Sequence, residues 1–305
     1  MAELTQKPID ASTRYCAVYG HPVRHSASPA MQNAGIAALG LNWRYLAFEV
    51  HPDDLRSALA GALAMRFIGV NLTVPHKVLA VPLVDALDDS ARFWGAVNTV
   101  RFEGRNSDES WRPLRDFDTP PQHIRSHGFN TDADAIAQAL REDLGLRLDG
   151  AKVLLLGAGG AGRTAALKLA SERTAELYLV NRTQSKAESV AGELRAHFPG
   201  LKTIVGYPSG EVDLVLNATS VGLRNEEQLP FDETRFSLRQ SQAVYDMIYR
   251  PAETRLLRQA KAIGCRSANG LGMLLYQGAR SLELWTGQPS PVDAMRRALQ
   301  RNVYA

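Results

Sequence analysis

The sequence predicts an α/β protein of two domains, and four observations support this. The chain has 305 residues, enough for two separate cores. Apolar strand-like runs alternate with helical patterns along most of the chain. In the second half these runs are continuously apolar, which is typical of a parallel sheet covered on both faces. One of them, Lys152 to Leu156, leads into a glycine-rich turn that opens a helix.

The composition narrows the classes of function. Hydrophobic residues make up 45% and charged residues 22%, as in ordinary soluble globular proteins. The net charge of +3 comes without a run of Lys or Arg, so we expect no nucleic-acid partner. No apolar run approaches the ~20 residues of a membrane span, and the first ten residues lack the apolar region of a signal peptide. We therefore expect no membrane association and a cytoplasmic protein.

Cysteines and histidines add little chemistry. Cys16 and Cys265 lie far apart and outside any C-x-x-C motif, which favours a reduced compartment. The seven histidines have no carboxylate or cysteine partners at ligand spacing, so we expect no metal site.

The elements of the first half follow from short apolar runs and one helix start. Ser28 followed by Pro29 predicts an N-cap and the first helical position. Leucines at four-residue spacing predict a helix over Pro52 to Met65. The predicted strands are Tyr15 to Gly20, Asn42 to Val50, Phe67 to Val74, where Pro75 is expected to stop the sheet, and Asn98 to Phe102.

The stretch Glu103 to Ser126 is polar, contains Pro113, Pro120 and Pro121, and shows no periodicity. It predicts an extended surface loop. A mobile flap is an alternative, and plain surface decoration is the simpler reading.

The second half shows a regular alternation. Ile136, Leu140 and Leu144 mark a helix before the strand that leads into the glycines. The elements predicted after the glycines are helix Thr164 to Ala170, strand Glu176 to Val180, helix Gln184 to His197, strands Val212 to Leu216 and Ala243 to Ile248, and helices Leu271 to Trp285 and Val292 to Gln300.

Gly157, Gly159 and Gly162 form the pattern G-x-G-x-x-G between an apolar strand and a helix. The first glycine permits a tight turn, the second a close approach to a pyrophosphate, and the third close packing of helix and strand. The helix N-terminus then offers free N–H groups and a positive dipole end to the anion. This context predicts a dinucleotide; a glycine-rich turn without a ligand is the alternative.

The end of the next strand indicates which dinucleotide. An NAD site would place a carboxylate there for the ribose 2′-OH. This chain instead has Asn181, Arg182, Thr183 and Lys186. A guanidinium, a hydroxyl and a second cation suit a phosphate, so NADP(H) is favoured. The alternative is that Arg182 is a solvated loop residue.

Polar residues gather in short clusters of the first half, mostly where strands end or helices begin. Hydroxyls, amides, one cation and one carboxylate suit a small polyhydroxylated acid as substrate. Each residue also has a structural alternative, such as a helix cap or a turn. The clusters are Ser26 and Ser28; Asn71, Thr73 and Lys77; Asn98 and Thr99; and Asn130, Thr131 and Asp132.

The ordered motifs HSASP, NLTVPHK, GAVNTV, GFNTD, GAGGAG, NRT, NATSVG and DMIYRP, with the final NG-x-G-MLL and ELWTG, resemble those of the shikimate dehydrogenase family. The resemblance runs from about Tyr19 to Gly287. It implies a substrate-binding domain (1–131 plus 270–305) and a Rossmann-like NADP-binding domain (132–269), with a cleft between them. It implies NADPH-dependent, reversible reduction of 3-dehydroshikimate to shikimate, in chorismate and aromatic amino-acid biosynthesis, by a monomer or homodimer.

The resemblance also assigns residues. Lys77 and Asp132 match the catalytic pair. The family's substrate positions correspond to Ser26, Ser28, Asn71, Thr73, Asn98, Tyr249 and Gln277. The cofactor positions correspond to Gly157, Ala158, Gly159, Gly160, Ala161, Gly162, Asn181, Arg182, Thr183, Lys186, Thr219, Met247, Gly270 and Met273.

The chain departs from the family pattern at several points. Gln32 stands where the family usually has histidine, Ala133 and Ala135 stand where it has glycines, and the segment before GFNTD is longer. Two alternatives stay open: a quinate/shikimate dehydrogenase that uses NAD, and an NADP-binding sensor without catalysis. The Ser-x-Ser pair and Arg182 oppose the first, and the presence of Lys77 and Asp132 opposes the second.

Overall fold

A computed structural model describes residues 6–119, 121–224 and 228–304 of the chain. The expectations drawn from the first ten residues and from Pro120 therefore fall partly or wholly outside the described residues. The chain divides into two compact units. The first runs to Asp132 and takes in Leu275–Val303, and the second is Ala133–Leu274 with Tyr304. Each unit is built around its own sheet, as the α/β prediction requires.

The first unit contains a mixed seven-stranded sheet in the order β2-β1-β3-β5-β7-β4, with β6 paired to β5. The strands β2, β1 and β3 are parallel, and β5 runs antiparallel to both β3 and β7. The strands are β1 (Arg14–Gly20), β2 (Trp43–Glu49), β3 (Gly69–Leu72), β4 (Ala86–Leu87), β5 (Thr99–Arg105), β6 (Trp111–Pro113) and β7 (Ile124–Phe129).

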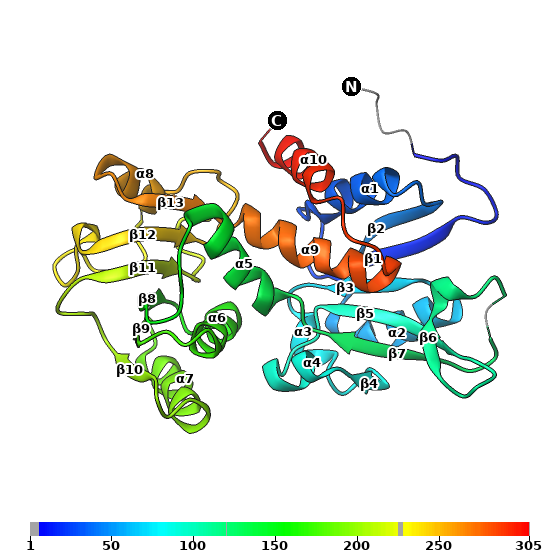
Figure 1. Ribbon diagram of the computed structural model, residues 1–305, viewed down its shortest axis with the longest axis horizontal. Helices are drawn as coiled ribbons and strands as arrows, with labels where there is room; N and C mark the ends of the chain where they lie inside the picture. The colour runs from blue at the N-terminus through cyan, green and yellow to red at the C-terminus, as the bar shows by residue number, and fades with distance from the viewer. Residues whose placement is uncertain (1–5, 120, 225–227, 305) are drawn as a thin grey trace. The chain divides into compact units, whose positions relative to one another are not determined.

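Helices cover both faces of this sheet (Figure 1). On one face lie α1, α9 and α10, and α2 lies on the other. Trp285 of α9 is buried and donates a hydrogen bond from Nε1 to the carbonyl oxygen of Val100 in β5. Gly69 of β3 makes room for this indole, because a Cβ there would overlap it. The helices are α1 (Ser28–Ala38), α2 (Leu55–Ala64), α3 (His76–Leu79), α4 (Asp89–Trp94), α9 (Leu271–Thr286) and α10 (Val292–Tyr304), with short 3-10 turns η1 (Pro52–Asp54) and η2 (Leu114–Asp116).

The second unit contains a six-stranded sheet in the order β10-β9-β8-β11-β12-β13, and every pairing in it is parallel. Residues 153–156 of β8 are fully buried, so the prediction of a continuously apolar central strand is confirmed. The elements are β8 (Lys152–Leu156), β9 (Glu176–Val180), β10 (Lys202–Val205), β11 (Val212–Asn217), β12 (Ser241–Asp246), β13 (Arg266–Asn269), α5 (Asp132–Leu144), α6 (Gly160–Ser171), α7 (Gln184–His197), α8 (Arg255–Ala262) and η3 (Leu238–Gln240).

The prediction of a surface loop over Glu103 to Ser126 is wrong. Strand β5 continues to Arg105, β6 and η2 follow, and β7 begins at Ile124. The polar side chains misled the prediction because they satisfy one another across the sheet. Glu103 is buried and accepts hydrogen bonds from Arg101 and Arg125, and it also bonds the ring of His127.

Two expectations about helix and strand ends are also corrected. Ser28 begins α1, but the N-cap residue is Ala27, so Ser28 does not cap the helix. Strand β3 ends at Leu72, before Pro75 is reached, and Pro75 instead precedes the short helix α3 as its N-cap residue. This helix carries Lys77.

Candidate functional site

Lys77 and Asp132 lie in direct contact within the first unit. Lys77 is on α3, just after β3, and Asp132 begins α5, just after β7. The Lys77 Nζ donates a hydrogen bond of 2.6 Å to Asp132 Oδ2. The lysine side chain is 32% exposed and the carboxylate 11% exposed, so the ammonium remains reachable while the carboxylate is mostly enclosed. The pair can therefore hold a proton next to a bound molecule.

Asn98 fixes the other oxygen of this carboxylate. Its Nδ2 donates to Asp132 Oδ1 at 2.9 Å and to Thr131 Oγ1 at 2.9 Å. Its Oδ1 accepts from the backbone N–H of Thr131. Asn98 is 1% exposed, so its amide works inside the fold and orients Asp132.

Asn71 is also committed to the interior. Its Oδ1 accepts a hydrogen bond from the Tyr45 hydroxyl at 2.8 Å. Its Nδ2 donates to the Asn98 carbonyl and lies within bonding distance of the hydroxyls of Thr99 and Ser281. Only 6% of the surface of Asn71 is exposed, so its amide mainly bonds other residues of the fold.

The sequence reasoning missed Ser281 on α9. Its hydroxyl is fully buried and lies 2.8 Å from Thr99 Oγ1 and 2.9 Å from Asn71 Nδ2. It also donates to the carbonyl oxygen of Gln277, one turn earlier. That carbonyl accepts a second bond from Thr131 Oγ1. The only signal in the sequence was a serine four residues after Gln277, on the same helix face.

The remaining substrate candidates are half-buried. Ser26 Oγ accepts a bond from the Ser28 backbone N–H, which places the two serines in one turn at the start of α1. Thr73 lies directly after β3, in a turn closed by the His76 N–H. These residues and Gln277 belong to the first unit, whereas Tyr249 belongs to the second, in the loop after β12. Burial raises the pKa of the Tyr249 hydroxyl.

His76, next to Lys77, anchors α3. Its side chain is fully buried, and its Nε2 donates to the carbonyl oxygen of Val50 at 2.9 Å. Burial lowers the pKa of this imidazole, so the neutral ring is favoured. The contact ties the turn that presents Lys77 to the segment after β2.

The glycine loop has the geometry of an anion site. Gly157 has a φ of 108°, in the left-handed region that favours glycine. A Cβ on Gly162 would overlap the Gly157 carbonyl, so only glycine allows this close packing. Gly159, Gly160 and Ala161 are exposed, and no side chain caps the N-terminus of α6. Its free N–H groups are thus open to a pyrophosphate.

The residues after β9 fit a phosphate-bearing ribose. Asn181 Oδ1 accepts from the Ala158 N–H, and its Nδ2 donates to the Thr183 carbonyl, so Asn181 joins this turn to the glycine loop. Arg182 and Lys186 are exposed. Neither forms an ion pair with any residue in the described part of the chain. Two uncompensated cations without a carboxylate suit the 2′-phosphate of NADP.

The other cofactor candidates line the same carboxyl edge of the second sheet. Thr219 packs against Gly157, and its hydroxyl donates to Asn217 Oδ1. The Met247 N–H donates to the Asn217 carbonyl. Gly270 lies against Met247, because a Cβ at 270 would overlap the Met247 carbonyl. The Met273 N–H donates to the Tyr245 hydroxyl.

A buried carboxylate supports this edge. Asp246, at the end of β12, accepts hydrogen bonds from Asn217 Nδ2 and the Thr254 hydroxyl. Burial raises the pKa of Asp246 despite these bonds, which act in the opposite direction. Asp246 thereby links the loops after β11 and β12 to the start of α8.

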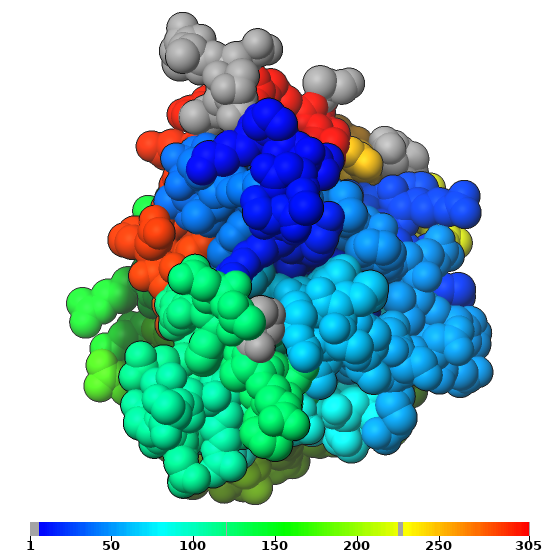
Figure 2. All heavy atoms as spheres, turned by 90° about the vertical axis from the view of Figure 1, so that its right-hand side faces the viewer, coloured from blue at the N-terminus to red at the C-terminus, as the bar shows by residue number. Residues whose placement is uncertain are grey.

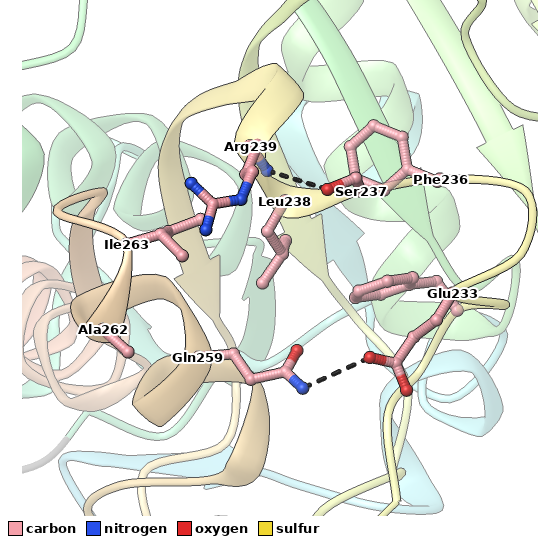
Figure 3. Close-up of a pocket in the computed structure, with 9 residues that line it drawn as sticks. Glu233, Phe236, Ser237, Leu238, Arg239, Gln259, Ala262 and Ile263 are labelled. Atoms are coloured by element: carbon pink, nitrogen blue, oxygen red, sulfur yellow. Dashed lines mark hydrogen bonds between the residues drawn. The ribbon is translucent and has the colours of Figure 1, made fainter.

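A small pocket in the second unit lies away from this edge (Figure 3). Its volume is about 290 Å³, and Phe236, Leu238 and Ile263 form its apolar part. At one end Gln259 donates to Glu233 (Figure 3). Because η3 directly precedes β12, the pocket is at the amino edge of the parallel sheet, opposite the glycine loop. It is therefore no part of the nucleotide site.

The departures from the family pattern are accommodated inside the fold. Ala133 and Ala135 are buried, so their methyl groups do not project into open space, and the Lys77–Asp132 contact forms in their presence. Gln32 is buried and donates from Nε2 to the Gly278 carbonyl, which joins α1 to α9 next to Gln277.

Within the described residues, no helix has the length and apolarity needed to cross a membrane. The same residues contain no group of three or more His, Cys, Asp or Glu side chains that could hold a metal ion.

A parallel nucleotide-binding sheet with a glycine loop, joined in one chain to a unit that carries a lysine–aspartate pair, defines an α/β dehydrogenase. Family models identify which family of dehydrogenases this is. One for the "shikimate dehydrogenase substrate binding domain" matches residues 18–100, "shikimate / quinate 5-dehydrogenase" matches 138–224, and "shikimate 5'-dehydrogenase C-terminal domain" matches 270–300. The chain belongs to the shikimate dehydrogenase family.

Individual relatives agree with this assignment. The shikimate dehydrogenase (NADP(+)) of Methanopyrus kandleri is 40% identical over 298 residues, covering 95% of this chain and 96% of the relative. A shikimate dehydrogenase solved with NADP+ superimposes with a TM-score of 0.84 at 33% identity, covering 98% and 99% of the two chains. The Thermus thermophilus enzyme, solved with NADP(H) and shikimate, gives a TM-score of 0.78 at 36% identity, covering 95% and 99%.

Proposed function

We propose that this protein catalyses the NADPH-dependent, reversible reduction of 3-dehydroshikimate to shikimate. The observation that carries the proposal is the 2.6 Å contact between Lys77 Nζ and Asp132 Oδ2, in a chain of this family. Reduction of a ketone places negative charge on its oxygen and requires a proton. An ammonium beside that oxygen can stabilise the charge and supply the proton.

Asp132 and Asn98 orient the ammonium in this proposal. The carboxylate accepts from Lys77 on one oxygen and from Asn98 on the other, so it cannot rotate freely. A non-catalytic sensor would not need this arrangement.

The cofactor would be NADP(H), whose nicotinamide supplies or accepts the hydride when bound. The glycine loop would hold the pyrophosphate, and Arg182 with Lys186 would hold the 2′-phosphate. Thr219, Met247, Gly270 and Met273 would line the nicotinamide side of the site. We propose residues 132–269 as the NADP-binding domain and residues 1–131 with 270–305 as the substrate-binding domain.

The substrate would meet Ser26, Ser28, Thr73 and Gln277, whose side chains are half-buried. Asn71 and Asn98 would contribute mainly by holding these groups in place, since their amides are already bonded inside the fold. Tyr249 is the remaining candidate for the substrate. We also propose that the protein is cytoplasmic and is a monomer or a homodimer.

An absorbance assay at the NADPH band tests the function, with shikimate and quinate each offered with NADP+ and NAD+. We expect the highest kcat/KM for shikimate with NADP+. Preference for quinate with NAD+ would favour the second candidate, a quinate dehydrogenase, which the family model for residues 138–224 also covers by name. No turnover with any pair would contradict both candidates.

A further inference from the structure

A second cavity is in the first unit, away from Lys77. Its volume is about 950 Å³. It lies where the parallel strands β1 and β2 begin, because Arg14 and Trp43 are their first residues and both line it. Lys77 instead follows the carboxyl end of β3, which is parallel to β1. The seven residues of β1 alone separate the two edges by about 20 Å.

The segment after β6 forms one wall of this cavity. Leu114 is buried, and the backbone around it is clamped by Arg14, which donates to the carbonyl oxygens of Leu114 at 3.3 Å and Phe117 at 2.5 Å. Arg115 donates to the carbonyl of Trp285, near the end of α9. This wall belongs to the segment between β5 and β7. Figure 2 looks onto this side of the first unit.

Three arginines from three separate segments line the cavity. They are Arg14 at the start of β1, Arg66 before β3, and Arg115 in η2. Arg115 is neutralised by Asp116, at 2.9 Å. Arg14 and Arg66 bond only backbone carbonyls, and neither forms an ion pair with another residue of the described chain. Asp118, which is exposed, is the one opposing carboxylate of the lining that has no basic partner in the described ranges.

The lining also has an apolar part. Tyr15, Leu41, Trp43 and Ile68 contribute to it, and Trp43 and Ile68 are buried in the core behind it. A phosphate group matches the fork geometry of two uncompensated arginines, and the apolar part offers contact to an organic body. The volume is within the range of small-molecule sites.

We propose that this cavity is an accessory site for a small organic phosphate, separate from the substrate and nucleotide sites. Arg14 and Arg66 bind the phosphate, and the rings of Tyr15 and Trp43 contact the organic part. The proposal does not depend on which substrate the enzyme reduces.

Calorimetric titration of the NADP+-saturated protein with phenyl phosphate, inorganic phosphate and phenol tests this site. Saturation with NADP+ removes the nucleotide site as a source of phosphate binding. We expect phenyl phosphate to bind most tightly, inorganic phosphate more weakly, and neutral phenol hardly at all. Equal binding of phenol and phenyl phosphate, or no binding of phenyl phosphate at about 10 mM, would overturn the proposal.

Three variants locate the binding. Arg66 has a φ of 61°, which asparagine tolerates better than most residues, so Arg66→Asn removes the charge with little backbone strain. We expect it to raise the Kd for phenyl phosphate about tenfold, as expected for the loss of one charge-assisted bond. Asp118→Asn removes the opposing carboxylate and should lower the Kd. Arg112→Ala, an exposed residue of β6 outside the lining, is the control and should leave the Kd unchanged.

Arg66→Asn and Asp118→Asn should change the affinity for phenyl phosphate in opposite directions, so a general loss of stability cannot explain the result. Wild-type affinity in both Arg66→Asn and Asp118→Asn would place the ligand elsewhere and refute the site. Turnover with shikimate and NADP+ should be unchanged in all three variants, because none of these residues touches the proposed catalytic groups.

Discussion

At the scale of single residues, Lys77 concentrates the proposed chemistry. Its ammonium is the one cation that contacts Asp132 in the described part of the chain. Lys77→Ala should lower kcat by about 10²- to 10⁴-fold, the usual contribution of a general acid, while shikimate still binds. Steady-state kinetics and equilibrium binding measure the two effects. Lys152→Ala, at an exposed position of β8, is the control, and near-normal kcat in Lys77→Ala would refute the assigned role.

Arg182 tests the choice of nucleotide. Its guanidinium is exposed and has no ion-pair partner within the described ranges, as expected of a group that binds a phosphate. Arg182→Ala should raise the KM for NADPH about tenfold or more and leave the KM for NADH nearly unchanged, since NADH lacks the 2′-phosphate. Arg195→Ala, on the last turn of α7, controls for a general loss of charge. Equal effects on both nucleotides would argue against the assignment.

Glu103 makes stability depend on pH. Burial raises the pKa of this carboxyl, but hydrogen bonds from His127, Arg101 and Arg125 outweigh burial and lower it from 4.5 to about 2. A carboxyl with a depressed folded-state pKa stabilises the fold above its unfolded pKa, and the contribution is lost as the pH falls from about 4.5 toward about 2. The shift corresponds to about 3 kcal/mol at neutral pH.

Urea unfolding of the wild type and Glu103→Gln measures this contribution. The difference in the free energy of unfolding should be largest at pH 7 and should shrink steadily below about pH 4.5. A difference that is independent of pH would mean that the Glu103 carboxylate contributes only packing.

At the scale of elements, hydrogen bonds of Ser281 join helix α9 to strands β3 and β5 of the first unit. Ser281 and Thr286 both have buried hydroxyls that donate to the carbonyl four residues earlier, but only Ser281 bonds Asn71 and Thr99. Ser281→Ala and Thr286→Ala should each cost about 1–3 kcal/mol of stability. Only Ser281→Ala should change the KM for shikimate, because it alone removes a hydrogen-bond partner of the Asn71 amide. The same KM in wild type and Ser281→Ala would confine Ser281 to a structural role.

The elements also show where sequence reasoning succeeds. Strands β8 and β9 and helix α7 were predicted with the bounds they have, because continuous apolar runs or a clear periodicity define them. Strands β6 and β7 were missed. In β7, Arg125 and His127 become acceptable in a strand only because Glu103, opposite Arg125 and diagonal to His127, bonds both. Strand β13 was missed since its four residues, Arg266–Asn269, carry no apolar pattern.

In the candidate site, too, some features could be predicted from the sequence and others could not. Lys77 and Asp132 could be selected from the sequence because each stands in a distinctive motif, and the fold brings them together. The interior bonds of Asn71 could not be foreseen, because its partners Tyr45, Thr99 and Ser281 come from three distant segments. Motifs mark the residue types, but only the tertiary fold shows which polar groups remain available.

At the scale of the whole molecule, binding of the cofactor should be visible as stability. A ligand that binds only the folded state stabilises it by RT ln(1 + [L]/Kd), or about 2.7 kcal/mol at one hundred times the Kd. NADP+ should therefore raise the Tm more than NAD+ at equal concentration. In Arg182→Ala this difference should become smaller. Equal shifts for both nucleotides in the wild type would speak against NADP preference.

The bonds around Asn71 have a consequence for the history of the chain. An amide with partners on β2, β5 and α9 restricts the order in which substitutions can accumulate. Loss of the hydroxyl at 281 leaves Nδ2 with the Thr99 hydroxyl and the Asn98 carbonyl, whereas loss of the amide at 71 removes one partner each from Tyr45, Thr99 and Ser281. A substitution at 71 thus disturbs more contacts than one at 281, and in double mutants the two losses should not add.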